Sequence, residues 1–298
     1  MKVLILGGSG MLGHKLWQTL APRFDAYVSF RSKPGSFAQP GIFDQSRSLS
    51  GLTVENIDGL ARAIEKVHAE VIVNCIGVVK QTAAGKDPAT SIEVNAWFPH
   101  RLAELCRLAG ARLIHLSTDC VFSGRKGNYK EGDTPDGEDL YGRTKLLGEV
   151  EGKNCLTIRT SMIGRELQGA QGLLEWFLAH EGGRVRGFTR AVFSGFTTLA
   201  LAEVIASVIA NHPELDGIWH VASEPISKFD LLMLVKQTYG LEIQIEPDAS
   251  VVCDRSLDGS HFRDATGIQS PPWPEMIENM RDDPTLYDMV REAHEPEG

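Results

Sequence analysis

KVLILGGSGMLG, residues 2–13, joins a short apolar run to three evenly spaced glycines. The run KVLIL is typical of a strand that is buried on both faces of a parallel sheet. Gly7, Gly10 and Gly13 follow at Gly-x-x-Gly-x-x-Gly spacing, and Leu16 and Leu20 then recur at helical spacing. Glycines at such a turn let backbone N–H groups reach a pyrophosphate at the helix N-terminus. The stretch therefore predicts the first strand, phosphate loop and helix of a dinucleotide-binding domain.

Outward from this stretch, apolar runs alternate with helical patterns up to about residue 160. The expected strands are residues 26–30, 71–77, 112–118 and 155–161. The expected helices are residues 57–69 and 89–110, and a further helix opened by Tyr141. Alternation of this kind predicts an α/β fold with a doubly wound parallel sheet, the Rossmann arrangement.

After residue 160 the alternation loosens, which predicts a smaller C-terminal lobe interleaved with the first domain. Two segments, residues 183–188 and 195–213, precede an expected strand at 217–223. The tail then includes an amphipathic stretch at 226–240 and a proline-rich stretch at 269–277. We expect residues 1–160 plus about 191–222 to form the NADP-binding Rossmann domain. Residues from about 161–190 plus 223–298 are expected to form the substrate-binding lobe.

Composition excludes several functional classes. The chain has 298 residues, 42% of them hydrophobic, and a net charge of −9 with no long Lys/Arg block, which argues against nucleic-acid binding. It contains no apolar run of about 18 residues, so we expect no membrane insertion. Five scattered cysteines without a Cys-x-x-Cys pair are typical of reduced thiols, and we expect a cytoplasmic protein. The histidines show no metal-ligand spacing, so no metal is expected.

The residues that follow the second strand bear on the choice of dinucleotide. An acidic residue at this place would bind the ribose 2′-hydroxyl of NAD, but the chain has Arg31, Ser32 and Lys33. Two cations and a hydroxyl suit the 2′-phosphate of NADP. The alternative is a solvated basic turn. We expect NADPH/NADP+ as the cofactor in preference to NADH.

A hydroxyl, a phenol and an amine form the candidate catalytic set. Thr118 follows a predicted strand, at the edge of the sheet where ligands bind in open α/β folds. Tyr141 and Lys145 lie one turn apart at the start of a predicted helix. An ammonium about 6 Å from a phenol, at an effective dielectric of about 20, contributes roughly 3 kcal/mol, or about two pKa units. We therefore expect Lys145 to lower the pKa of Tyr141.

The motifs together resemble the extended short-chain dehydrogenase/reductases, most closely the dTDP-4-dehydrorhamnose reductase-like branch. The matching residues are the glycine loop, NCIG (74–77), Asn95, STDCVFSG (117–124), YGRTKLLGE (141–149), IRTS (158–161) and CDRSLDGSHF (253–262). The resemblance implies NADPH-dependent reduction of the 4-keto group of a nucleotide-linked 6-deoxyhexose, in the biosynthesis of surface-polysaccharide sugars. The nucleotide could be dTDP or UDP, and a homodimer is possible.

The resemblance also assigns residues. It implies that Tyr141 protonates the substrate carbonyl oxygen, that Thr118 holds that oxygen, and that Lys145 also bonds the nicotinamide ribose. Asn95 would steady the catalytic geometry. The implied cofactor-binding residues are Gly7, Ser9, Gly10, Met11, Leu12, Gly13, Arg31, Ser32, Cys75, Ile76, Gly77, Ser117, Tyr141 and Lys145. The implied substrate-binding residues are Val79, Thr118, Asp119, Cys120, Tyr141, Met162 and Arg255, of which Arg255 would reach the substrate diphosphate.

Some positions differ from the dTDP-4-dehydrorhamnose reductase pattern. Cys120 stands where those relatives tend to have an aromatic residue, and Met162 where they tend to have Trp. Val78 or Val79 replaces a polar residue. A less polar pocket of different shape is expected, which suits a bulkier sugar such as a 2-acetamido-2,6-dideoxy-4-hexulose. Lys15 replaces a glutamate that binds magnesium in some relatives, so no such metal is expected.

Three other functions compete with the reductase. A 4,6-dehydratase would need an acid at the position of Cys120, which argues against it. An NAD-dependent nucleotide-sugar 4-epimerase would retain oxidised NAD, against which Arg31 argues. A non-catalytic nucleotide-binding regulatory subunit, like that of methionine adenosyltransferase, has no need to keep Thr118, Tyr141 and Lys145 together.

Overall fold

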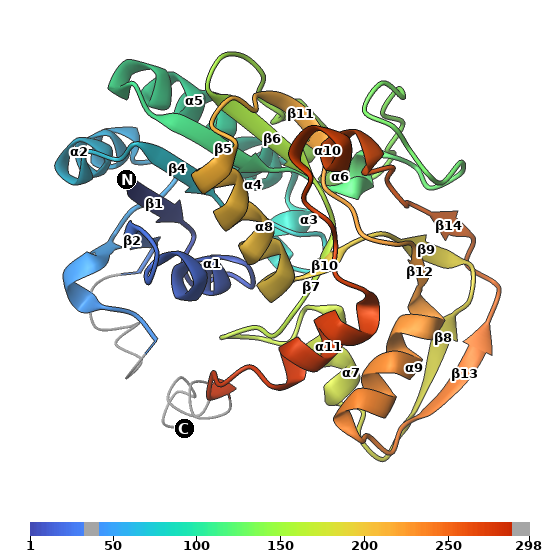
Figure 1. Cartoon of the computed structure of the whole chain (residues 1–298). Helices are drawn as coiled ribbons and strands as arrows, with labels where there is room; N and C mark the ends of the chain where they lie inside the picture. Colours follow the sequence, from blue (N-terminus) through green and yellow to red (C-terminus); the bar gives the residue numbers. More distant parts are fainter. Residues whose placement is uncertain (33–41, 288–298) are drawn as a thin grey trace.

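The computed structural model describes residues 1–32 and 42–287, and these residues build a seven-stranded parallel sheet at the centre of the protein (Figure 1). The strands are β1 (Lys2–Leu6), β2 (Asp25–Phe30), β3 (Ser48–Ser50), β4 (Val71–Asn74), β5 (Arg112–Leu116), β6 (Cys155–Arg159) and β11 (Gly217–His220). Their order is β11-β6-β5-β4-β1-β2-β3, and each neighbouring pair is parallel. The expected doubly wound α/β fold is confirmed, with its topological switch point between β1 and β4.

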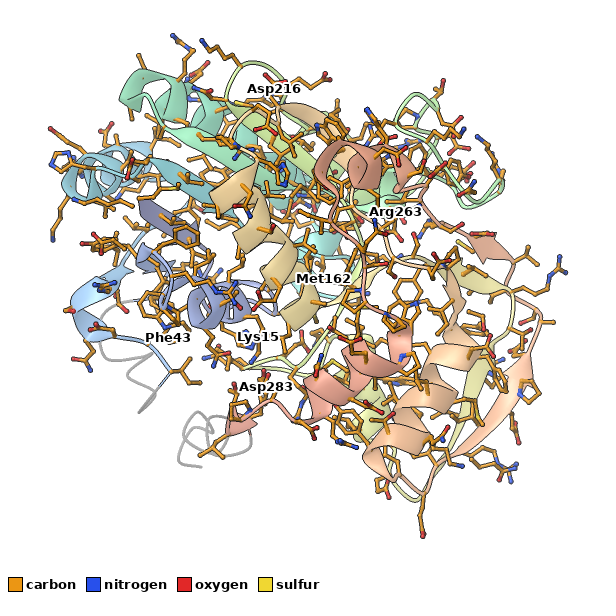
Figure 2. The ribbon with its side chains drawn as sticks, in the orientation of Figure 1. Lys15, Phe43, Met162, Asp216, Arg263 and Asp283 are labelled. Atoms are coloured by element: carbon orange, nitrogen blue, oxygen red, sulfur yellow. The ribbon has the colours of Figure 1, made fainter. Side chains whose placement is uncertain are left out.

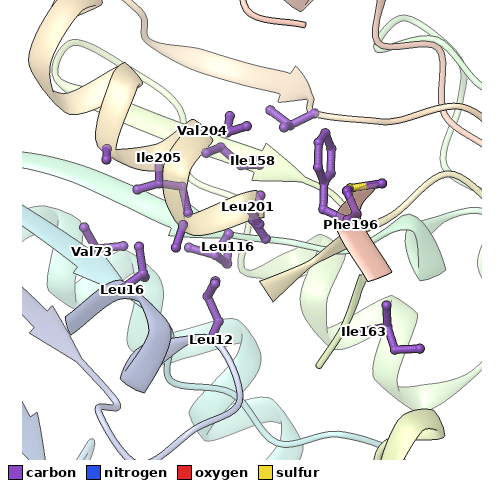
Figure 3. Close-up of a cluster of buried hydrophobic side chains, with 14 of the residues drawn as sticks. Leu12, Leu16, Val73, Leu116, Ile158, Ile163, Phe196, Leu201, Val204 and Ile205 are labelled. Carbon is purple, nitrogen blue, oxygen red and sulfur yellow. The ribbon is translucent and has the colours of Figure 1, made fainter. Parts of the chain in front are cut away.

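The first strand shows why both faces of the sheet need a cover of helices. Val3 and Ile5 belong to one hydrophobic cluster with α1 (Gly13–Leu20) and α8 (Thr198–Asn211). Leu4 and Leu6 belong to a second cluster with α2 (Ile57–Val67) and α5 (Phe98–Ala109). Figure 3 shows the first cluster, where side chains of α1 and α8 meet above the sheet. The wholly apolar strand is thus buried on both faces, as its sequence predicts.

Several strands end earlier than expected, and the residues released form loops at the ligand-binding edge. The strand expected at 71–77 ends at Asn74, and the strand expected at 112–118 ends at Leu116. Residues 75–77 and 117–118 therefore lie in the loops that leave the carboxyl ends of β4 and β5. A short 3-10 turn, η3 (Asp119–Val121), follows the second of these loops.

The long helix expected at 89–110 is interrupted. It consists of α4 (Pro88–Ser91), a π-helical segment η2 (Ile92–Trp97) and α5. Pro99 has no N–H to give to the carbonyl of Asn95, and its ring crowds that carbonyl, so the regular α-helical bond cannot form there. The segment packs against α6 (Leu140–Leu147), and a Cβ on Gly148 would lie 1.9 Å from the Asn95 carbonyl oxygen.

The remaining elements include a smaller lobe beside the large sheet (Figure 1). The strands outside the large sheet are β7 (Met162–Ile163), β8 (Arg184–Phe188), β9 (Ala191–Phe193), β10 (Phe196–Thr197), β12 (Ile226–Ser227), β13 (Gln244–Asp248) and β14 (Cys253–Asp254). The other helices of this C-terminal half are α7 (Leu173–Leu178), α9 (Lys228–Tyr239), α10 (Ser260–Thr266) and α11 (Trp273–Arg281). The short elements η1 (Gln45–Arg47) and α3 (Ala83–Lys86) complete the order.

The chain crosses between the two parts, because β11 joins the large sheet after β8 and β9 have entered small sheets. We propose the division into a Rossmann domain (1–160 and about 191–222) and a substrate lobe on this basis. No helix within residues 1–32 and 42–287 has the length and apolar character needed to cross a membrane.

Candidate active site

The glycine loop between β1 and α1 has glycines at places where no side chain fits. A Cβ on Gly13 would lie 2.1 Å from the carbonyl oxygen of Gly7, and Gly7 itself has a φ of +85°. A Cβ on Gly8 would lie 2.2 Å from Cγ2 of Val28, whereas one on Gly10 would come no closer than 3.3 Å to its nearest neighbour. The tightest packing therefore falls on Gly8 and Gly13. Gly8 lies outside the spaced pattern that the sequence analysis used.

Backbone N–H groups at the start of α1 are available to an anion. Leu12 is the N-cap residue, no side chain caps the helix, and its first turn has no acidic residue. Below the loop, Nδ1 of the buried His14 donates to the carbonyl oxygen of Gly10 at 2.8 Å. Ser9 and Met11 are partly exposed in the same loop. A glycine-rich turn at an uncapped helix N-terminus fits the pyrophosphate of a dinucleotide.

The residues expected to distinguish NADP from NAD follow β2. The backbone N–H of Gly8 donates to the carbonyl oxygen of Ser29 at 2.9 Å, which ties the glycine loop to that strand. Arg31 is exposed and Ser32 is partly exposed immediately after the strand. Because β1 and β2 are parallel, both residues lie at the same edge of the sheet as the loop. Lys33 lies outside the described residues.

The loop after β4 is held by Asn95. Oδ1 of the buried Asn95 accepts from the backbone N–H of Val78 at 3.0 Å, and its Nδ2 donates to the Val78 carbonyl oxygen at 2.9 Å. A Cβ on Gly7 would lie 3.2 Å from the carbonyl carbon of Cys75. Residues 75–77 and the glycine loop therefore meet at the switch point, where a nucleotide would span both.

Thr118 and Tyr141 lie together beyond the end of β5. The Thr118 hydroxyl donates to Oδ1 of Asp119 at 3.1 Å and accepts from the backbone N–H of Cys120 at 3.1 Å. It also acts on the side chain of Tyr141, whose pKa it lowers. Tyr141 is the second residue of α6, which Asp139 caps by accepting from the Gly142 N–H at 2.7 Å. The hydroxyl and phenol expected to face a carbonyl oxygen are thus side by side.

The pKa of Tyr141 differs from the sequence-based expectation. Burial raises it above the ordinary value, and the charges that Cys120, Asp119 and Asp139 carry when ionised add to the rise, while Thr118 opposes it. The expected lowering by Lys145 is not found. Tyr141 faces acidic groups and little water, so the neutral phenol is the stable form in this structure.

Lys145 is buried and its ammonium is turned toward the sheet. Its Nζ donates to the carbonyl oxygen of Leu116 at 2.6 Å. Burial lowers the pKa of Lys145 to about 8, against the opposing influence of Glu149 and Cys75. This direction of the side chain explains why the one-turn spacing alone gave a wrong expectation for the Tyr141 pKa.

A buried ion pair between Glu149 and Arg159 lies near Lys145, and it was not expected from the sequence. Glu149 Oε1 accepts from Ser117 Oγ at 2.6 Å and from Arg159 Nε at 2.8 Å, while Oε2 accepts from Arg159 Nη2 at 2.7 Å. Both charged side chains are 4% exposed. The Ser117 hydroxyl is thereby committed to Glu149. Glu149 and Arg159 were visible only as parts of the quoted motifs YGRTKLLGE and IRTS, and nothing in the spacing showed that they pair.

The small lobe brings Arg255 to the candidate substrate side. Its Nε donates to the carbonyl oxygen of Phe122 at 2.9 Å, and its Nη1 lies 3.4 Å from Sγ of Cys120. Burial raises the pKa of Asp119, and the charge of Arg255 opposes that rise. Lys228 at the start of α9 also faces Asp119 and Cys120, although the sequence analysis did not single it out.

Within the residues that the structure describes, Met162 and Val79, two of the expected substrate-binding residues, form no hydrogen bond or ion pair with Cys120, Asp119 or Arg255. Met162 lies in β7 and packs against the main core cluster, and Figure 2 shows it between the two parts of the chain. Val79 follows the loop that Asn95 clamps, and it is 39% exposed.

Lys15, which stands where some relatives are expected to have a magnesium-binding glutamate, is buried on α1. It pairs with Asp283, and its Nζ donates to Oγ1 of Thr285 at 2.9 Å. Figure 2 shows Lys15 directed toward Asp283. Within the described ranges, no group of three or more His, Cys, Asp or Glu is placed to hold a metal ion.

Known proteins resemble this chain in sequence. The chain is 28% identical over 246 residues to the dTDP-4-dehydrorhamnose reductase of Shigella flexneri, covering 75% of this chain and 73% of that one. It is 29% identical over 151 residues to the probable low-salt glycan biosynthesis reductase Agl14 of Haloferax volcanii. This match covers 50% of the chain and 48% of the relative, so the chain matches about half the length of several curated relatives.

A solved structure shows the same fold. The dTDP-4-dehydrorhamnose reductase of Bacillus anthracis, solved in complex with NADP, aligns with a TM-score of 0.76 and 21% identity. The alignment covers 94% of this chain and 98% of that one. A family model described as the RmlD substrate binding domain matches residues 1–285. Since that match spans nearly the whole chain, the protein belongs to the RmlD substrate-binding-domain family.

Proposed function

We propose that the protein is an NADPH-dependent oxidoreductase that reduces the 4-keto group of a nucleotide-linked 6-deoxyhexose. The observation that carries the proposal is the Thr118–Tyr141 pair, which meets the loops after β1 and β4 at the carboxyl edge of the sheet. Membership of the family and the reductase names of its relatives support the same activity.

The proposed cofactor site is formed by the glycine loop, residues 75–77, Ser117 and Lys145. Gly8 and Gly13 let the loop pack closely on β2 and on itself, and the uncapped N-terminus of α1 offers N–H donors to the pyrophosphate. Arg31 and Ser32 would bind the 2′-phosphate of NADP. When bound, NADPH supplies a hydride to the substrate carbonyl carbon.

Tyr141 is the proposed proton donor. Its raised pKa keeps the phenol protonated at neutral pH, which is the form that a reduction consumes. The Tyr141 O–H bond breaks as the proton passes to the carbonyl oxygen, and Thr118 holds that oxygen by a hydrogen bond. A hydride on carbon and a proton on oxygen together turn the ketone into an alcohol. Lys145, one turn away and buried, would bond the nicotinamide ribose.

The reductase names of the relatives favour reduction over the epimerase alternative. Tyr141 would act in both reactions, as proton donor in a reduction and as proton acceptor in the oxidation that begins an epimerisation. The two functions therefore differ in the cofactor that the protein retains, which is NADPH taken from solution for a reductase and bound NAD for an epimerase.

The substrate pocket is proposed between Tyr141 and the small lobe. Arg255 and Lys228 would attract the diphosphate, since both cations reach the group around Asp119. Cys120, Met162 and Val79 give an apolar wall that suits a bulkier sugar such as a 2-acetamido-2,6-dideoxy-4-hexulose. All five cysteines are free, which fits the proposed cytoplasmic setting. We propose surface-polysaccharide sugar biosynthesis as the process served, and a homodimer as the assembly.

A panel of enzymatically made dTDP- and UDP-4-keto sugars tests the function. We expect NADPH absorbance to fall with at least one 4-keto-6-deoxy sugar, with the product alcohol identified by NMR. Turnover of a 4-hydroxy sugar without net NADPH consumption would instead establish the epimerase. NADPH binding without turnover of any panel member would favour the regulatory protein.

A further inference from the structure

The buried pair of Glu149 and Arg159 lies near the proposed catalytic residue Lys145, because Glu149 comes four residues after Lys145 in the chain. Glu149 follows the C-terminal end of α6, and Arg159 ends β6. The two side chains make a bidentate contact of 2.8 and 2.7 Å with both partners 4% exposed. Replacing a buried pair of this kind with apolar residues is often neutral for stability, so stability alone does not account for it.

The pair belongs to a longer hydrogen-bonded chain. Arg159 Nη1 lies 3.4 Å from Nε2 of His220, and Nδ1 of His220 lies 3.0 Å from the carbonyl oxygen of Tyr129. At the other end, Glu149 accepts from the hydroxyl of Ser117 at 2.6 Å. The chain therefore connects the outer strand β11 with the residue that precedes Thr118.

The surroundings of Lys145 give Glu149 a particular electrostatic role. Tyr141 lies one turn earlier on the same helix, Cys75 reaches Lys145 from the end of β4, and His115 faces it from β5. Burial raises the pKa of Cys75 to about 12 and lowers that of His115, so both are neutral at pH 7. Lys145 Nζ donates to the carbonyl oxygen of Leu116, and Glu149 accepts from the hydroxyl of Ser117, the next residue, so the ammonium and the carboxylate are held at adjacent residues where β5 ends. At this place the charge of Glu149 stabilises the Lys145 ammonium.

We propose that Glu149 and Arg159 are positioning residues: Glu149 keeps Lys145 a cation in the cofactor crevice, and Arg159 limits that effect while holding Glu149 and Ser117 in place. The inference rests on the proposed function, because it concerns the lysine expected to bond the nicotinamide ribose.

Two single variants with opposite expected effects test the proposal. Glu149→Gln removes the negative charge, so Lys145 loses its proton at a lower pH. Activity that needs the ammonium is lost as pH rises through the Lys145 pKa, and the alkaline limb of kcat/KM therefore moves to lower pH, by about one unit. Arg159→Gln leaves Glu149 uncompensated, so the same limb moves to higher pH.

A binding measurement gives a readout independent of turnover. The Kd of NADPH is followed by protein fluorescence between pH 6 and 10. In each variant we expect the Kd to rise at the pH to which the alkaline limb of kcat/KM has moved. Glu151→Gln is the matched control, because Glu151 is exposed two residues along the chain. Its profile should coincide with that of the wild type.

The double variant Glu149→Gln/Arg159→Gln covers the case in which a single variant does not fold, since it leaves neither charge buried without a partner. Its alkaline limb is expected between those of the two singles. The proposal would be overturned if the alkaline limbs of both single variants were unchanged or moved in the same direction. The role of Glu149 and Arg159 would then be that of a structural ion pair.

Lys145→Met separates this inference from the proposed function. If Lys145→Met leaves NADPH affinity and turnover at the wild-type level, the role of Lys145 in the proposed function is wrong. If Lys145→Met is impaired but the Glu149 and Arg159 variants show no shift, only the positioning proposal is wrong.

Discussion

Asp283→Asn should destabilise the protein by more than any surface change near it. Asp283 is 7% exposed and pairs with Lys15, which is 2% exposed on α1, the helix that follows the glycine loop (Figure 2). Removing one partner of a buried pair leaves an uncompensated charge and costs about 3–5 kcal/mol. For a chain of 298 residues this corresponds to a fall in Tm of roughly 6–10 °C.

The assay is thermal unfolding followed by circular dichroism, with two comparison variants. Asp282→Asn changes the neighbouring exposed carboxylate, whose partner Arg281 is also on the surface, and should leave Tm unchanged. Lys15→Met/Asp283→Asn removes both buried charges and should recover more than half of the loss. A Tm for Asp283→Asn equal to that of Asp282→Asn would refute the reasoning.

The pH dependence of this effect has a definite sign. Burial opposes ionisation of Asp283, but the hydrogen bond and charge of Lys15 outweigh it and hold the pKa below its ordinary value. A carboxyl with a lowered folded-state pKa contributes stability above its unfolded pKa of about 3.9, and that stability is lost as pH falls through the folded pKa. The difference between wild type and Asp283→Asn should therefore shrink in acid.

Three further outcomes are expected. Gly8→Ala places a Cβ 2.2 Å from Val28 and should weaken NADPH binding at least tenfold by fluorescence titration, whereas Gly132→Ala, which meets nothing within 4 Å, should not. Asn95→Ala removes both hydrogen bonds to Val78, so it should lower the free energy of unfolding in urea by about 1–3 kcal/mol and also lower kcat. Equal stability of Asn95→Ala and the wild type would contradict the conclusion that Asn95 holds the loop after β4. Arg31→Ala should raise the Kd of NADPH by tenfold or more and leave that of NADH unchanged, with the exposed Arg62→Ala as control; equal losses for both cofactors would remove Arg31 from 2′-phosphate binding.

The local pattern of the chain was enough to predict the large sheet. Runs such as residues 3–6 and 71–73 are apolar throughout because helices cover both faces of the central strands. The order of the predicted strands along the chain, together with the glycines after the first strand, predicted that the glycine loop, Thr118 and Tyr141 lie at the carboxyl edge of the sheet. Parallel strands bring their carboxyl ends together whatever the intervening loops contain.

What the sequence could not show depends on contacts between distant residues. The spacing of Tyr141 and Lys145 placed them on one helix but did not show that the Lys145 ammonium turns to the Leu116 carbonyl. Likewise, Gly8 is constrained by Val28 of the next strand, which no glycine spacing reveals. The break at η2, by contrast, had a local signal, because Pro99 stands in the middle of the helix expected at 89–110 and removes a regular hydrogen bond there.

The proton-donor role of Tyr141 is tested most directly by single-turnover oxidation of NADPH with Tyr141→Phe and a 4-keto sugar that the wild type reduces. We expect the rate to fall at least a hundredfold, with NADPH affinity retained, because the phenol hydroxyl alone is removed. Tyr27→Phe, on β2, controls for loss of a tyrosine hydroxyl elsewhere and should keep the wild-type rate. A Tyr141→Phe rate within tenfold of the wild-type rate would contradict the proposed chemistry.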